Sequence, residues 1–155
     1  MDQVDTTAPA TATPKSLYIV GALALLWNGF GSYDYLMTRM RNTDYLQSMM
    51  PTVDPEATLA WVDGFPLLAQ AGWALGVWAG LIGAMLLLAR SRWAVPALGL
   101  SMLGAIVGLG YQILAAPPLP GAEGPMVDYM PFVIILAAIA FFLFARAMQR
   151  RGVLR

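Results

Sequence analysis

The chain contains neither cysteine nor histidine among its 155 residues. Without these side chains it cannot form a disulfide, use a thiol nucleophile, or bind a metal through thiolate or imidazole ligands. The usual Ser-His triad and a histidine-ligated haem are excluded for the same reason. We therefore expect a protein that is not an enzyme, with no catalytic residues, no cofactor and no metal site.

Charge is also scarce. Only 12% of the residues are charged, while 59% are hydrophobic and the mean hydropathy is +0.64. Soluble domains carry roughly 25% charged residues, so this chain has too few charges to cover a water-exposed surface. The composition indicates a membrane protein whose first partner is the lipid bilayer. The net charge is zero, which gives no electrostatic reason to expect nucleic-acid binding.

Four stretches are long and apolar enough to cross the bilayer as helices, which takes about 17–25 residues each. They cover residues 17–37, 67–89, 94–114 and 127–147. The first stretch carries more polar residues than the other three. The sequence therefore predicts an all-α, polytopic membrane protein with a four-transmembrane-helix bundle, which forms a single domain over residues 16–150.

The two ends of the chain differ from this domain in composition. Residues 1–15 are rich in Thr, Ala and Pro and contain few large apolar side chains. Such a segment cannot bury enough apolar surface to fold, so we expect a disordered N-terminal tail. Residues 151–155 form a short basic C-terminal tail.

The longest connection between the expected spans covers residues 38–66. Within it, Asp54-Pro55-Glu56 has the pattern of a helix start, with an N-cap, a proline in the first turn and an early acid. Gly64 gives a matching stop. We expect a short helix at about residues 55–63. The first span could also continue as a helix past Arg41, with Pro51 as its latest stop.

The charged residues divide unequally between the two sides of the membrane. With four spans, both termini and the second connection share one side, which carries seven basic residues and two acids. The opposite side carries two basic residues and seven acids. Because cytoplasmic segments are enriched in Lys and Arg, we expect both termini to be cytoplasmic. The seven basic residues are Lys15, Arg90, Arg92, Arg146, Arg150, Arg151 and Arg155.

Polar side chains recur on one face of the first span. At about 100° per residue, Asn28, Ser32, Tyr35 and Arg39 share this face, and bulky apolar residues occupy the opposite one. Asn28 lies near the expected bilayer midplane, and Asp34 lies near the outer boundary. These side chains either form polar contacts between helices or line a solute path. Trp73, on the second span, could stack on a solute or pack between helices.

Small residues form a stripe on each of the next two spans. Glycines at every third or fourth position let two helix backbones approach closely. The sequence therefore predicts tight helix packing and leaves open whether the partner helix belongs to the same chain or to a second copy. The glycines are Gly72, Gly76, Gly80 and Gly83 on the second span, and Gly104 and Gly108 on the third.

Three sequence segments together resemble a known protein family. They are LWNGFGSYDYLMT (residues 26–38), Phe65-Pro66, and WALGVWAGLIGAMLLLARSRWAVP (residues 73–96). The combination resembles an uncharacterised family of small four-span bacterial inner-membrane proteins, whose members often carry the label "sugar transporter". The resemblance covers roughly residues 17–114. It implies a four-span topology and the bacterial inner (plasma) membrane, and it assigns no functional residues.

Three functional hypotheses follow from the sequence. The first is a non-enzymatic helical bundle that forms a homo-oligomer or associates with another membrane protein. The second is a transporter of a small solute, such as a sugar, that acts as an oligomer and uses Asn28, Ser32, Tyr35 and Trp73. The third is a membrane enzyme based on Asp, Glu, Arg, Tyr and Ser side chains, which we rank last because no arrangement of these residues stands out.

Overall fold

A computed structural model describes residues 13–155, and every regular element in this range is a helix. The expected all-α class is therefore confirmed. The sequence predicts a disordered tail over residues 1–15. Residues 1–12 of this segment lie outside the described range, and its last residue, Lys15, begins the first helix. The helices are α1 (Lys15–Arg39), α2 (Thr43–Met49), α3 (Pro55–Asp63), α4 (Leu67–Leu88), α5 (Ala94–Leu114) and α6 (Pro125–Arg150).

Three of these helices are long and apolar enough to cross a membrane. They are α4, α5 and the part of α6 from Val127 to Arg150. Helix α1 has 25 residues, which is sufficient length for a span. Its sequence is less apolar because it contains an asparagine, several small residues and an aspartate.

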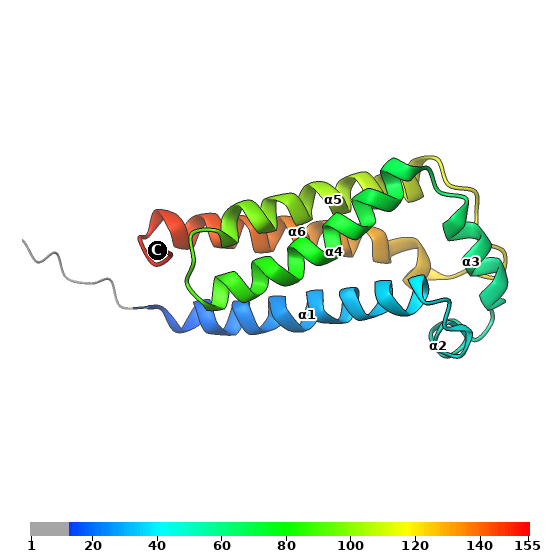
Figure 1. Cartoon of the computed structure of the whole chain (residues 1–155), viewed down its shortest axis with the longest axis horizontal. Helices are drawn as coiled ribbons and strands as arrows, with labels where there is room; N and C mark the ends of the chain where they lie inside the picture. Colours follow the sequence, from blue (N-terminus) through cyan, green and yellow to red (C-terminus); the bar gives the residue numbers. More distant parts are fainter. Residues whose placement is uncertain (1–12) are drawn as a thin grey trace, which may run out of the picture.

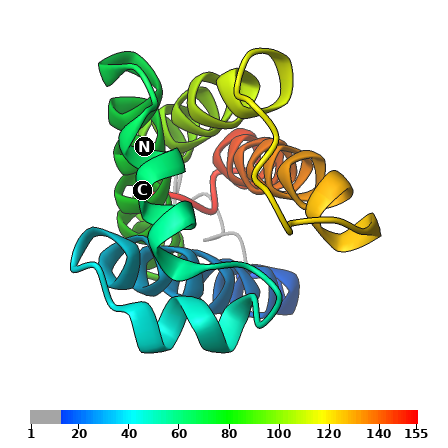
Figure 2. The same ribbon diagram turned by 90° about the vertical axis from the view of Figure 1, so that its right-hand side faces the viewer.

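The four long helices run side by side along the bundle, and α2 and α3 lie together at one end (Figure 1). Viewed end-on, their order around the bundle is α1, α4, α5, α6 (Figure 2). Helix α1 packs on α4, α4 packs on α5, and α5 packs on α6, while α1 and α6 touch only slightly. Few residues of α6 are therefore buried.

The connection between α1 and α4 contains two short helices. Helix α3 begins where the Asp54 side chain accepts a hydrogen bond from the Glu56 N–H, at 3.2 Å, and it ends at Gly64. Helix α2 has no counterpart in the sequence-based expectations. It begins at Asn42, whose side chain accepts from the Tyr45 N–H at 2.9 Å.

Helix α1 does not continue beyond Arg41. It ends at Arg39, and Arg41 has a φ of 56°. This left-handed backbone conformation cannot belong to a right-handed helix, so the chain turns here and starts α2 in a new direction.

The C-terminal segment is packed against the bundle. Val153 and Leu154 are buried in the same core cluster as Leu17 and Leu87. The segment also bonds to the connection between α4 and α5: Arg155 N–H donates to Arg90 O, and Arg92 N–H donates to Arg155 O, both at 2.7 Å. The residues expected to form a basic tail are thus part of the folded bundle.

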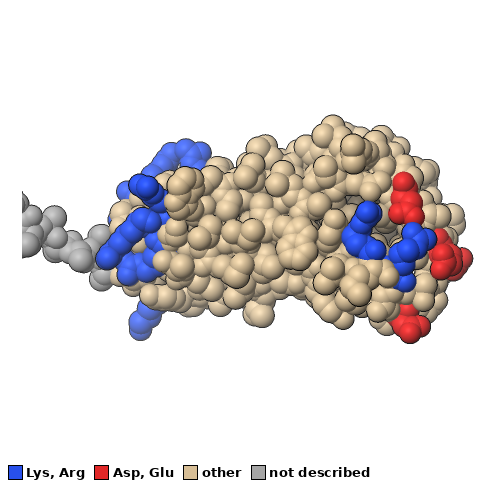
Figure 3. Space-filling model, in the orientation of Figure 1, with Lys and Arg blue, Asp and Glu red and all other residues tan. Residues whose placement is uncertain are grey.

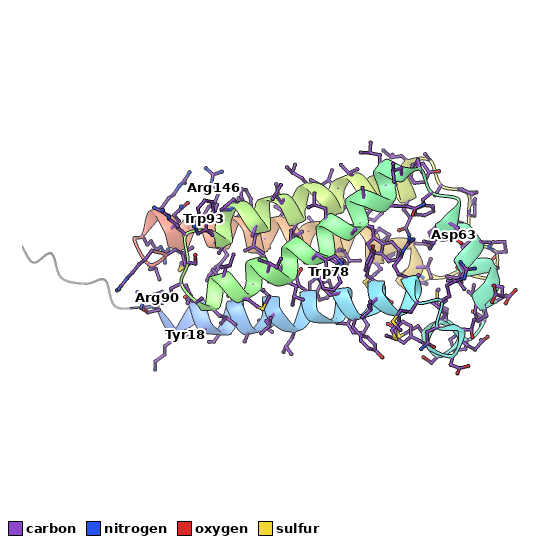
Figure 4. The ribbon with its side chains drawn as sticks, viewed as in Figure 1. Tyr18, Asp63, Trp78, Arg90, Trp93 and Arg146 are labelled. Atoms are coloured by element: carbon purple, nitrogen blue, oxygen red, sulfur yellow. The ribbon has the colours of Figure 1, made fainter. Side chains whose placement is uncertain are left out.

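Charged side chains separate toward the two ends of the bundle. On the face drawn in Figure 3, most Lys and Arg gather at one end, the acids gather at the other, and a wide belt between them has no charge. Figure 4 places Arg90, Trp93 and Arg146 at the basic end and Asp63 at the opposite end. At that acidic end, Arg41 Nη1 pairs with Asp63 Oδ2 at 2.8 Å. After the orientation expected from the sequence, we call the two regions the inner (basic) end and the outer (acidic) end.

Candidate functional site at the interface of α1 and α4

The polar face of α1 lies against α4. From one contact to the next, the residue number on α1 rises while the residue number on α4 falls. The two helices therefore pack antiparallel in one constant register. The pairs, from the middle of the bundle to the outer end, are Asn28 with Gly80, Ser32 with Val77, Tyr35 with Trp73, and Arg39 with Gln70. We call this series of contacts the α1–α4 polar seam.

Asn28 occupies the point where three helices meet. Its Nδ2 donates to the Ala24 carbonyl of its own helix at 2.8 Å. Its Oδ1 lies so close to Gly80 that a Cβ at position 80 would overlap with it. Ser101 of α5 also lies beside Gly80, and its hydroxyl donates to Gly76 O at 2.6 Å. The amide is therefore accommodated by a helical hydrogen bond and by the missing side chain of a glycine.

The next two pairs of the seam are packing contacts. The buried Ser32 hydroxyl donates to the Val77 carbonyl across the interface, at 3.3 Å. The Tyr35 ring makes edge-to-face contacts with Trp73 and Trp78, with centroid separations of 4.8 and 6.3 Å. This geometry is favourable for aromatic pairs. Trp73 therefore packs against α1, where its side chain is partly buried.

The seam ends in an exposed polar contact. Arg39 Nη1 donates to Gln70 Oε1 at 3.3 Å, and Gln70 Nε2 donates to the Phe65 carbonyl at 2.8 Å. These bonds connect the last turn of α1 to the residues that precede and begin α4. They fix the exposed outer end of the seam.

Asp34 lies outside the seam and contacts α2. Tyr45 Oη donates to Asp34 Oδ1 at 2.9 Å, and the Tyr45 ring packs edge-to-face on Tyr33 with a centroid separation of 5.4 Å. Burial and the hydrogen bond to Asp34 raise the pKa of Tyr45 well above its usual value near 10.0. The carboxylate therefore anchors α2 on α1. This contact was not expected from the sequence because α2 itself was not.

We expect the folded protein to show a late phase in an absorbance titration of its tyrosines. The raised pKa means that the fold favours neutral Tyr45. This contribution to stability is complete below the ordinary tyrosine pKa and is lost as pH rises through the folded-state value. Tyr45→Phe should remove the late phase, whereas Tyr18→Phe, at an exposed position, should leave it in place. A late phase that survives in Tyr45→Phe would contradict this assignment.

The glycine stripes of α4 and α5 face each other. A Cβ at Gly72 would lie 2.9 Å from Gly108 N, and one at Gly104 would lie 2.7 Å from Gly72 O. A Cβ at Gly76 would lie 3.1 Å from Ala105 N. Gly83 instead packs under the Leu98 side chain, 2.7 Å from its Cγ by the same measure. The stripe on α4 therefore packs against α5 of the same chain, and at Gly80 it also meets Asn28 of α1.

These contacts use packing and hydrogen bonds, and the hydrogen bonds of Arg39 and Asp34 each involve a charged group. In the part of the chain that the structure describes, no three Asp or Glu side chains come close enough together to hold a metal ion. No family model matches the sequence, and neither a curated protein nor a solved structure matches the chain.

Proposed function

We propose that the protein is an integral membrane protein with four spans, in which α1 crosses the membrane together with α4, α5 and α6. At 1.5 Å per residue its 25 residues extend about 37 Å, enough to cross the hydrocarbon core. Helix α1 also packs along most of α4, from Gly21 against Leu88 to Arg39 against Gln70. A bilayer that surrounds α4 therefore surrounds α1 as well.

The surface of α1 fits this placement. Asn28, Ser32 and Arg39 face α4. The large apolar residues Ile19, Leu23, Leu26 and Phe30 are exposed and would contact lipid. The inner end holds an excess of basic residues, which favours a cytoplasmic location for that end and for both termini. Together with the family resemblance, this supports the inner membrane of a bacterium.

Within that membrane, the function best supported is that of a non-enzymatic helical bundle. The observation that carries it is the junction at Gly80, where Asn28 and Ser101 fill the space between α1, α4 and α5. A solute path through the middle of one chain would need this space to be open. Because the stripe on α4 is occupied by α5, a second copy or another membrane protein would bind through the outward faces of α1 and α6.

Thiol labelling tests this proposal, since the natural chain has no cysteine. We expect Asn28→Cys to resist a membrane-impermeant maleimide in intact cells and in inverted vesicles. Glu56→Cys should react in intact cells, and Arg151→Cys should react only in inverted vesicles. These two controls report the sides on which the outer and inner ends lie. Reaction of both controls on one side would contradict the four-span arrangement.

Transport of a small solute by an oligomer is the second candidate function. It is favoured by the continuous polar seam, which leads from Asn28 to an exposed contact at the outer end. Labelling of Asn28→Cys would mean that water reaches the middle of the bundle. Ser32, Tyr35 and Trp73 would then become the residues to test for loss of solute uptake into reconstituted vesicles.

A further inference from the structure

Helix α6 carries a shallow pocket at the inner end of the bundle, away from the polar seam. It has a volume of about 270 Å³ and is lined by Leu143, Arg146, Ala147, Arg150 and Arg151. The spacing of three and four residues places the first four side chains in one stripe along the helix, and Arg151 follows at its end. The stripe thus changes from apolar to basic toward the inner end.

The three arginines form a concentrated positive charge. Within residues 13–155, the ion pairs all belong to Arg41 at the outer end, so these three guanidinium groups have no carboxylate partner there. The C-terminal carbonyls of a helix oppose an anion, but their effect equals only about half an elementary charge. Three full positive charges exceed it. The pocket is therefore attractive to anions.

Two features hold the pocket in shape. The Arg146 guanidinium lies over the Phe142 ring, 5.6 Å from its centroid, a cation–π contact that restricts the side chain. Beyond Arg151, the buried Val153 and Leu154 and the backbone bonds of Arg155 fix the chain against the connection between α4 and α5. The last turn of α6 is thereby held in place.

We propose that this pocket binds the phosphate headgroup of an anionic phospholipid from the inner leaflet. The inference rests on the membrane-spanning arrangement proposed above, which places the inner end at headgroup depth. Guanidinium groups match phosphate oxygens with paired, charge-assisted hydrogen bonds. Leu143 and Ala147 continue the stripe toward the apolar belt, where an acyl chain of the same lipid would lie.

Native mass spectrometry of the full chain in detergent tests the proposal, with phosphatidylglycerol and phosphatidylcholine titrated separately. We expect phosphatidylglycerol to bind more tightly. Each arginine near an anionic lipid contributes about fivefold in affinity, so the double variant Arg146→Gln/Arg150→Gln should lower this preference by about tenfold or more. A double lysine variant at the same positions keeps the charge and should retain most of the preference.

Lys15→Gln/Arg92→Gln is the matched control, because it removes the same charge from other elements of the inner end. Neither Lys15 nor Arg92 lines the pocket, so the control should change the preference by less than about threefold. An equal loss in both double variants would overturn the pocket as the site, and so would no loss in either. Equal binding of phosphatidylglycerol and phosphatidylcholine would overturn the assignment to an anionic lipid.

The labelling controls separate a failure of this inference from a failure of the proposed function. If Glu56→Cys and Arg151→Cys react on opposite sides while the lipid preference is unaffected by the arginine variants, the lipid site alone is wrong. If those two positions react on the same side, the four-span arrangement fails, whatever lipid binds in detergent.

Discussion

Replacing Gly104 by valine should lower the free energy of unfolding by about 3 kcal/mol or more. A Cβ at this position would lie 2.7 Å from Gly72 O and 2.9 Å from Gly76 Cα. Both are backbone atoms of α4, so no side chain can rotate to make room. The two helices would have to separate, and the neighbouring close contacts at Gly72 and Gly76 would be lost with them.

Gly110→Val on the same helix is the matched control. Nothing lies within 4 Å of a Cβ built at Gly110, so we expect a change of less than about 1 kcal/mol from helix propensity alone. Both variants would be unfolded thermally and with denaturing detergent, with helical circular dichroism as the signal. Equal stability of the two variants would show that the contact between α4 and α5 is looser than the structure describes.

In the proposed membrane arrangement, the expected size of the effect follows from the lipid that surrounds the helices. Lipid tails are as apolar as the side chains they surround, so apolar burial does not drive two helices together in a membrane. Dispersion contacts between close surfaces must do so, and these weaken steeply with separation. The interface of α4 and α5, which depends on backbone-to-backbone contact at Gly72, Gly76 and Gly104, is therefore sensitive to a single added methyl group.

The helices of the core could be predicted because local residues mark where they begin and end. The sequence predicted spans at residues 67–89 and 94–114, and the structure has Leu67–Leu88 and Ala94–Leu114. Pro66 fixes the start of the first of these helices, and the charged turn at Arg90 and Arg92 separates the two. The pattern around Asp54 similarly placed a helix at about 55–63, where α3 runs from Pro55 to Asp63.

Other elements could not be predicted because they depend on contacts between distant residues. The left-handed conformation of Arg41 has no sequence signal, since arginine is not a residue that favours it. Helix α2 did have a local signal, Asn42 followed by an acid in the first turn, but seven residues are too few to show a periodicity. The contact between Tyr45 and Asp34 depends on both features.

The candidate site, too, could be predicted from the sequence only in part. Periodicity places Asn28, Ser32 and Tyr35 on one face of α1, and the contacts with α4 lie on that face. Which helix covers the face, and in which register, is set by the close approach that glycines allow between helices. The sequence does not indicate the arginine pocket, because basic residues at the end of a spanning helix are typical of membrane topology alone.

The second large effect is expected at the inner end. Leu154→Ala should lower the free energy of unfolding by about 2–5 kcal/mol, the range for a leucine removed from a packed core. Leu154 is only 6% exposed and shares its core cluster with Leu17 and Leu87. Because the adjacent backbone bonds to the connection between α4 and α5, loss of this side chain should loosen the end of α6 together with that turn.

The same substitution at Leu114, which is 86% exposed, provides the matched control and should cost less than about 0.5 kcal/mol. Thermal unfolding in detergent compares the two variants, and hydrogen exchange at Arg92 and Arg155 reports the docked segment directly. Faster exchange there in Leu154→Ala, with unchanged exchange in Leu114→Ala, is the expected result. If both variants unfold like the natural protein, residues 153–155 do not contribute to the fold. The segment would then act only as a basic tail, as its composition alone suggests.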